Sequence, residues 1–331
     1  MAANERIITD ATAQAIRNAI DQITLTLGGE PEGPLTSYEA NVLPVRKKDI
    51  TDDFFNGDLR SEIAAGNFAH VRPGDYIIGP SSGTTYYVAC CDWMYGKGDQ
   101  TNTAAQAGAY GTHHLGLMVY KHNGSTRMWC GYTNADKTAK VSANDKGACP
   151  WNAAADVDPT DTEAAGQNST NISRTYNGAS KSAYLGSFIR ERIDAIILEE
   201  DFKADFGSAN VLKFRNWLSR SINTSAVSGG YTGWTGAASG CDWVDRYIDL
   251  PSEVEVYGAR IVSSAHYDVG VQCEQLPLFR NAGIYDFFPR MSFWLKAVAS
   301  STVACYRSYN GAASYNSAGN AVWACPLACV K

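Results

Sequence analysis

The sequence predicts an α+β domain, because its strand-like and helix-like patterns lie in separate blocks. Residues 49–141 alternate short apolar runs with turn residues, which is typical of β-strands. Two helical patterns follow over residues 188–200 and 209–222, and short strands are expected after a polar loop. No repeat of fixed length recurs along the chain, so a solenoid is excluded.

The N-terminal segment carries an apolar stripe at helical spacing, which predicts a helix over residues 4–27. The stripe consists of Ile16, Ile20, Ile23 and Leu27. Two glycines end it, and residues 28–44 are expected to be a linker with little to pack on. The helix either packs on its own domain or serves self-association or docking. We therefore expect residues 1–44 to form an oligomerisation or docking segment, and residues 45–331 to form the folded domain.

Within the β-like block, Pro73, Gly74 and Asp75 predict a turn. Strands are expected at residues 76–78, 84–89, 115–120 and 127–132. The polar stretch 133–183 is expected to be a long surface excursion.

The first helical pattern is expected to begin after Ser187, whose side chain can cap it. The apolar residues of this pattern are Phe188, Ile189, Ile193, Ile196 and Ile197. Those of the second pattern are Val211, Leu212, Phe214, Trp217 and Leu218.

Composition excludes several functional classes. The net charge is −6 and the pI is about 5.4, whereas nucleic-acid binding needs clustered Lys and Arg. No run of apolar residues is long enough to cross a bilayer, and the first residues lack the pattern of a secretory signal. Motifs for phosphate, dinucleotide or metal-dependent catalysis are missing, so neither catalytic residues nor a cofactor is expected.

The nine cysteines are an odd number without a CxxC pair, which predicts buried, reduced thiols made in a cytoplasm. The adjacent His113 and His114 begin an apolar run, and neighbouring side chains of a strand point to opposite faces. No metal site is therefore expected there.

The string Leu-Pro-Ser-Glu-Val-Glu-Val-Tyr-Gly, from Leu250 to Gly258, predicts a capped turn that begins a helix or strand. It resembles the Leu-Pro-Thr-Glu-Ala-Glu-Trp-Glu signature of the formylglycine-generating-enzyme and C-type-lectin-like superfamily. It resembles more closely the Leu-Pro-Ser-Glu-x-Glu-x-x-Gly string of a phage-encoded family of uncharacterised domains, common in prophages of gut bacteria. Shorter similarities to that family lie at residues 112–118, 184–189, 275–279 and 293–296. They cover roughly residues 70–331, although the Gly-Phe-Arg ending of many lectin-like domains is missing here.

Residues 297–322 are rich in Tyr, Ser, Asn, Gly and Ala, with one Arg and no Lys, Glu, Gln, Met or Trp. Tyr supplies rigid contact area, and Ser, Gly and Asn supply adaptable hydrogen bonds, as in antibody paratopes. In phage variable proteins diversified by retroelements, changes at adenines of Asn-type codons yield only residues whose codons end in a pyrimidine. Every residue of 297–322 belongs to that set. A hairpin of small residues at the domain end explains the same composition without diversification.

The resemblance implies a C-type-lectin-like α+β domain with short mixed or antiparallel sheets and two helices, preceded by the N-terminal helix. It further implies a non-catalytic protein of the phage virion surface, a tail fibre or receptor-binding protein. Such a protein is made in the host cytoplasm and is expected to be a homotrimer. Its expected partners are a host cell-surface protein or glycan and other virion proteins, without nucleic acid or membrane insertion.

The expected ligand-contacting residues are Tyr306, Arg307, Ser308, Tyr309, Asn310, Tyr315, Asn316 and Asn320. Trp294 and Trp323 are expected to flank them as core anchors. One alternative is a head decoration or head-fibre protein, whose C-terminal region contacts only its neighbours. Another is an oxidase resembling formylglycine-generating enzyme, with Cys325 and Cys329 as a redox or copper pair, although no family motif places these cysteines.

Overall fold

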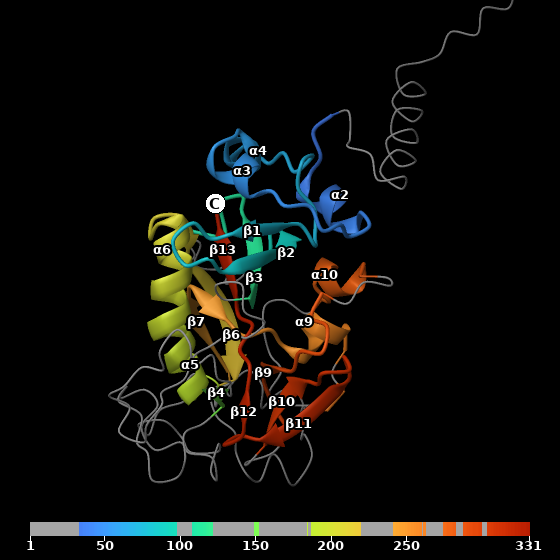
Figure 1. Cartoon of the computed structure of the whole chain (residues 1–331), viewed down its shortest axis with the longest axis vertical. Coiled ribbons are helices and arrows are strands. Elements are labelled where there is room, and N and C mark those ends of the chain that lie inside the picture. Colours follow the sequence, from blue (N-terminus) through green and yellow to red (C-terminus); the bar gives the residue numbers. More distant parts are fainter. Residues whose placement is uncertain are drawn as a thin grey trace, which may run out of the picture.

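The computed structural model describes residues 33–97, 108–121, 149–151, 184, 187–219, 241–259, 261–262, 274–282, 287–299 and 303–331. These residues combine helices with antiparallel sheets, so the α+β class is confirmed (Figure 1). The helix expected over 4–27 and the strand expected over 127–132 lie outside the described residues. None of the described helices is long and apolar enough to cross a membrane.

The central sheet contains six short strands paired in antiparallel fashion. They are β1 (Tyr76–Ile78), β2 (Thr85–Cys91), β3 (Leu115–Lys121), β5 (Val211–Leu212), β8 (Ile248–Asp249) and β13 (Leu327–Val330). The order is β1-β2-β3-β13-β5, with β8 also paired to β13. The strands expected at 76–78, 84–89 and 115–120 are thus confirmed as β1, β2 and β3. All four residues of β13 are buried, since this strand lies between β3 on one side and β5 and β8 on the other.

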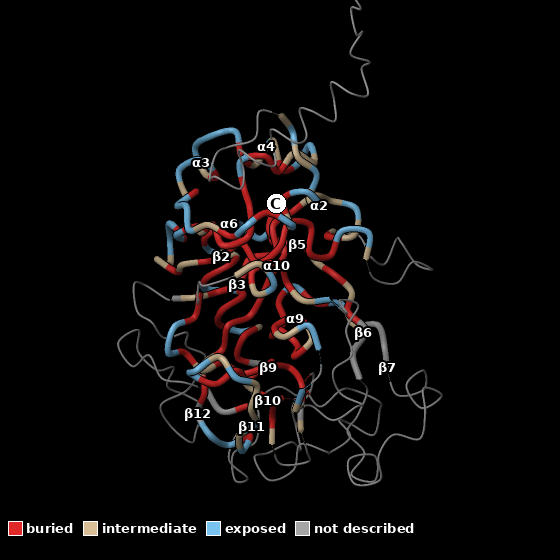
Figure 2. The backbone as a smooth tube through the Cα atoms, turned by 90° about the vertical axis from the view of Figure 1, so that its right-hand side faces the viewer, coloured by how far each residue is buried: buried red, intermediate tan, exposed pale blue. Residues whose placement is uncertain are grey.

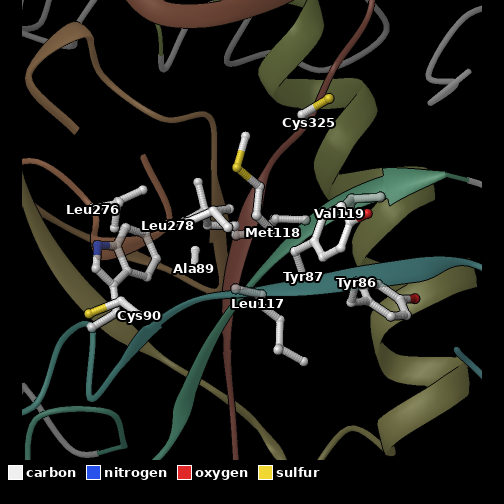
Figure 3. Packing of buried hydrophobic residues seen from close by; sticks show 14 of the residues in the cluster. Tyr86, Tyr87, Ala89, Cys90, Leu117, Met118, Val119, Leu276, Leu278 and Cys325 are labelled. Atoms are coloured by element: carbon white, nitrogen blue, oxygen red, sulfur yellow. The ribbon is translucent and has the colours of Figure 1, made fainter. Parts of the chain in front are cut away.

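Both faces of the central sheet are covered, as two consecutive tyrosines of β2 show. Tyr86 packs against Phe202 and Phe206, with ring centroids 4.8 and 5.1 Å away. Tyr87 points to the other face and packs edge-on against Phe287 at 5.2 Å. Figure 3 shows both rings among the neighbouring core residues. A strand buried on both faces needs apolar residues at successive positions rather than alternate ones, which the sequence of β2 provides.

A long helical segment covers the Tyr86 face of the sheet. It runs through α5 (Phe188–Arg192), a π-helical stretch η2 (Ile193–Phe202) and α6 (Lys203–Phe206). Ser187 caps it by accepting a hydrogen bond from the Arg190 backbone N–H, as expected. It ends at Phe206, six residues beyond the expected boundary at residue 200, and Gly207 follows at φ +82°. The helix is therefore confirmed and longer than expected.

The second expected helix, over 209–222, is wrong. Residues 211–212 form β5, and β6 (Phe214–Ser219) pairs with β7 (Cys241–Arg246). The apolar spacing in this stretch fits a helix, but the side chain of buried Asn216 donates to Asp249 Oδ2 at 3.0 Å. A buried amide such as that of Asn216 needs a hydrogen-bond partner, and strand β6 places it beside Asp249.

Two expectations near the N-terminus also need correction. Residues 37–42 of the expected linker form helix α2 (Ser37–Val42), which Thr36 and Glu39 begin with a capping box. Ala40 is buried, and the Asn41 amide exchanges hydrogen bonds with the Cys91 backbone, so α2 packs on β2. The β-like block begins with two further helices, α3 (Thr51–Phe55) and α4 (Leu59–Ala64), rather than with strands.

The expected surface excursion over 133–183 includes a buried portion. Strand β4 (Cys149–Pro150) pairs with β12 (Ala321–Val322). Next to it, Trp151 is fully buried, and its indole N–H donates to the Leu295 carbonyl at 3.1 Å. Burial of a side chain as large as Trp151 stabilises the packing of this segment on the domain, although the residues around it in the sequence are mostly polar.

The second sheet lies at the other end of the molecule from α3 and α4 (Figure 1). It consists of β9 (Phe293–Val298), β10 (Val303–Arg307) and β11 (Ala313–Ser317), in the order β11-β10-β9. Two short helices, α9 (Glu253–Tyr257) and α10 (Pro277–Arg280), contact each other, α9 packing on β9 and α10 on β2.

Asp205 joins the long helical segment to the β1–β2 turn. Its carboxylate accepts hydrogen bonds from the backbone N–H groups of Ser81 and Ser82, each at 2.8 Å, from the Ser82 hydroxyl, and from the Tyr86 hydroxyl at 2.6 Å. A side chain at Gly79 would come within 2.0 Å of this carboxylate, so only glycine fits there. Four donors therefore depend on one buried acid.

We expect Asp205→Ala to lower the free energy of unfolding by about 3 kcal/mol, because several buried donors lose their acceptor at once. Urea unfolding followed by circular dichroism measures the change. Asp53→Ala is the matched control, since its side chain is 56% exposed and forms a surface ion pair with Lys48. Equal stability of the two variants would show that Asp205 does not hold the turn.

Candidate binding surface

Strands β10 and β11 form a hairpin that carries the expected ligand-contacting residues. Cys305 pairs with Tyr315 and Arg307 with Ala313 across the two strands. The hairpin turns through Tyr309, Asn310 and Gly311, where the Ser308 carbonyl accepts from the Gly311 N–H at 2.9 Å and the Ser308 N–H donates to the Ala312 carbonyl at 2.9 Å. Gly311 adopts φ +86°, a conformation that glycine takes without strain and that three-residue hairpin loops require.

The outer part of the hairpin exposes two tyrosines. Tyr309 is 67% exposed and Tyr315 is 59% exposed, so large aromatic rings face solvent. Asn310 and Asn320 are exposed and Asn316 is half-buried, with its Oδ1 accepting from Asn320 Nδ2 at 2.6 Å. In Figure 2 the buried tube of β9 gives way to intermediate and exposed residues along β11 and the turns beside it. These five residues therefore lie where a ligand can reach them.

Arg307 and Ser308 do not belong to that surface, which corrects the sequence-based expectation. Both are 7% exposed. Arg307 Nη1 donates to the backbone carbonyls of Phe288 and Met291, at 3.1 and 3.0 Å, and the guanidinium lies over the Phe293 ring. An arginine side chain can be buried among apolar residues when carbonyl oxygens accept its hydrogen bonds and an aromatic ring interacts with its positive charge. Arg307 thus fastens the end of β10, next to the hairpin turn, to the domain.

The tyrosine of strand β10 is half-buried, unlike Tyr309 and Tyr315. Tyr306 packs edge-on against Trp294, with ring centroids 6.0 Å apart. Trp294 is fully buried, as expected for an anchor, whereas Trp323 is only partly buried. The Trp294 N–H donates to the Trp323 carbonyl at 2.8 Å, so the two are joined through their backbones.

The Leu-Pro-Ser-Glu string supports the sheet beneath the hairpin. Ser252 and Glu255 form a capping box that begins α9, which confirms the expected capped turn. Glu255 also accepts from the Trp93 indole at 3.2 Å and lies 3.4 Å from Lys296 Nζ on β9. The backbone N–H of Lys296 donates to the Pro251 carbonyl at 3.0 Å.

The other glutamate of the string, Glu253, is fully buried and accepts from the backbone N–H groups of Ile261 and Val262. Both acids of the string are therefore engaged in fixed hydrogen bonds. Each carboxylate accepts from backbone N–H groups: Glu253 joins α9 to residues 261–262, and Glu255 accepts from the buried N–H of Ser252.

A second polar cluster surrounds Asp92, which the sequence did not single out. Its carboxylate accepts from the His114 backbone N–H at 3.0 Å and lies 2.8 Å from His113 Nδ1. The ring of His113 stacks on Tyr95 at 4.2 Å. Asp92 adopts φ +56°, an uncommon conformation for a residue other than glycine. No sequence motif connects positions this far apart.

Within the residues that the structure describes, no group of three or more His, Cys, Asp or Glu could hold a metal ion.

Five of the cysteines are buried and form no disulfide: Cys90, Cys91, Cys305, Cys325 and Cys329. Cys90 and Cys329 each pair with Gly116 from opposite sides, which places them two strands apart. That separation is roughly 9.5 Å between backbones, beyond the reach of a disulfide. Burial raises the pKa of the Cys90 thiol to about 12, and it raises the pKa of Cys329 as well.

Comparison of the chain with protein-family models, with curated proteins and with solved structures gives no match in any of the three. The assignment of the chain to the α+β class therefore rests on its helices and sheets alone.

We expect these five cysteines to resist alkylation by iodoacetamide at about pH 8 in the native chain and to react after denaturation. Burial keeps the reagent away from all five thiols. For Cys90, Cys91 and Cys329 burial also raises the pKa, which leaves little of the thiolate that acts as the nucleophile. Mass spectrometry of peptides before and after unfolding in urea measures the difference. Rapid native labelling of Cys325 and Cys329 would instead favour the redox alternative.

Proposed function

We propose that this chain is a non-catalytic surface protein of a phage virion, a tail fibre or receptor-binding protein. In this proposal its domain is C-type-lectin-like, and its ligand surface consists of Tyr309, Asn310, Tyr315, Asn316 and Asn320. The observation that carries the proposal is the exposure of two tyrosines on a hairpin that buried Arg307, next to its turn, holds to the domain. The resemblance of the Leu-Pro-Ser-Glu string to phage domains supplies the biological setting.

The chemistry of the hairpin suits binding better than packing within the domain. Two exposed tyrosine rings provide apolar contact area with a hydroxyl at the edge, at a low cost in conformational entropy. The neighbouring asparagines provide both donors and acceptors. Residues 308–322 contain no charged side chain, so a neutral partner surface such as a glycan or an uncharged protein patch matches them.

The proposal includes self-association through the stripe Ile16, Ile20, Ile23 and Leu27, which lies outside the described residues. Three linked copies would present three hairpins to one cell surface. Several weak contacts then act together, because each bound copy holds the others at a high effective concentration.

We expect the double variant Tyr309→Ala, Tyr315→Ala to lose binding to host cells by about 100-fold, taking roughly 1–2 kcal/mol for each interfacial tyrosine. Fluorescently labelled full chain is titrated against a panel of gut-bacterial strains and measured by flow cytometry. Tyr38→Ala is the matched control, because this tyrosine is 76% exposed on α2, at the other end of the molecule (Figure 1).

Unchanged binding by the double variant would rule out the hairpin as the ligand surface. A chain that binds none of the strains but binds purified phage heads would favour the head-decoration alternative over the receptor-binding one.

We expect natural variation to concentrate in codons of exposed hairpin residues. Codons for Tyr309, Asn310 and Tyr315 should vary at adenine positions, whereas those for buried Arg307 and Ala318 should stay fixed, because changes there disturb packing. Sequencing the gene from independent phage isolates tests this, with residues 33–97 as the internal reference. Equal variation in both regions would argue against targeted diversification.

A further inference from the structure

Two Asn-Gly dipeptides lie within the described residues, Asn56-Gly57 after α3 and Asn310-Gly311 at the tip of the hairpin. In such a pair, the glycine backbone nitrogen can attack Cγ of the asparagine side chain. The bond from the glycine nitrogen to Cγ forms and the Cγ–Nδ2 bond breaks. Nδ2 takes up the proton that the glycine nitrogen loses and leaves as ammonia, and a cyclic succinimide remains. Water then opens the ring to aspartate or isoaspartate. The reaction needs no other reagent, so the surroundings of each pair decide its rate.

At Asn310 the side-chain carbonyl is already polarised by two donors. Its Oδ1 accepts hydrogen bonds from the Ser308 hydroxyl and from the Ala312 backbone N–H, the latter at 3.1 Å. Attack on Cγ moves negative charge onto this same oxygen. Donors placed where an oxyanion develops stabilise the transition state more than the ground state.

The charge near the attacking nitrogen is positive. Arg307 Nη2 lies beside Gly311, only 3.3 Å from the position that a Cβ atom there would take. The Gly311 nitrogen must lose its proton before or during attack, and a neighbouring guanidinium favours the resulting negative charge. The guanidinium is held in place by the carbonyls of Phe288 and Met291.

Asn56 has the opposite surroundings. Its side-chain Nδ2 donates to Asp52 Oδ1 at 2.7 Å, so a carboxylate holds the group that would leave. Space beside Gly57 is closed as well, since a Cβ there would lie 2.8 Å from the Asp53 carbonyl. The glycine N–H donates to a carbonyl oxygen in both pairs, at 2.9 Å for Gly311 and 3.2 Å for Gly57, so that bond does not favour Asn310.

From these contrasts we infer that Asn310 is a site of spontaneous deamidation in the folded protein, while Asn56 is protected. The conversion places a negative charge within residues 308–322, which otherwise carry none. The inference holds whether or not the hairpin binds a host receptor. If it does, the age of a particle alters its binding surface.

The test is a time course of the full native chain at about pH 8.5, digested with trypsin and read by mass spectrometry. Asn56 falls in the peptide from Asp49 to Arg60, and Asn310 falls in the peptide that begins at Ser308. We expect the mass gain of about one dalton, with separate aspartate and isoaspartate peaks, to accumulate at Asn310 at least about tenfold faster than at Asn56. A tenfold ratio corresponds to only ~1.4 kcal/mol in barrier.

Two controls keep the result interpretable. In urea both pairs have the same local chemistry, so their rates should converge. Ser308→Ala removes one donor to Oδ1 and should slow the native reaction at Asn310 while leaving Asn56 unchanged. If native Asn310 converts no faster than native Asn56, or if Ser308→Ala has no effect on its rate, the inference is overturned.

Discussion

The pairing of β13 on both of its sides is the constraint on which the other elements depend. This strand joins β3 to β5 and β8, and every one of its residues is buried. It also follows the hairpin directly in sequence, with only β12 and a short connection between them. The exposed hairpin is therefore bounded by two fixed segments, β9 before it and β13 after it. Residues at its tip can differ without moving the core, because the backbone on either side is held by sheet hydrogen bonds.

Buried polar groups position the elements around that sheet. Arg246 donates to Asp194 at 2.8 and 2.7 Å and to Asp249 at 2.8 Å, which ties the long helical segment to β8. Glu255 and Lys296 tie α9 to β9 in the same way. Such pairs contribute little net stability compared with apolar residues of equal size, but removing one partner is costly. Their effect here is to fix which surfaces meet, and therefore where the hairpin lies.

The sequence indicated the parts of this structure that local patterns determine. The strands of the central sheet up to residue 120, the Ser187 cap and the capped turn at Ser252 each depend on neighbouring residues, and each is present. The apolar pattern at 209–222 predicted a helix wrongly. The buried Asn216 side chain hydrogen-bonds to Asp249, 33 residues later, and a local pattern does not include such a distant contact. At the candidate site, composition drew attention to the hairpin, but only the fold separates buried Arg307 from exposed Tyr309.

The position of β13 also bears on how the chain reaches its native state. Leu327 pairs with Met118, about 200 positions earlier, so the sheet closes through contacts of very high sequence separation. A chain still emerging from the ribosome holds β1, β2 and β3 without their neighbour, and β3 then presents an open edge. Folding of the sheet must wait until synthesis has passed the hairpin. A change in the hairpin that interferes with this late closure would therefore prevent the whole sheet from forming, rather than alter the hairpin surface alone.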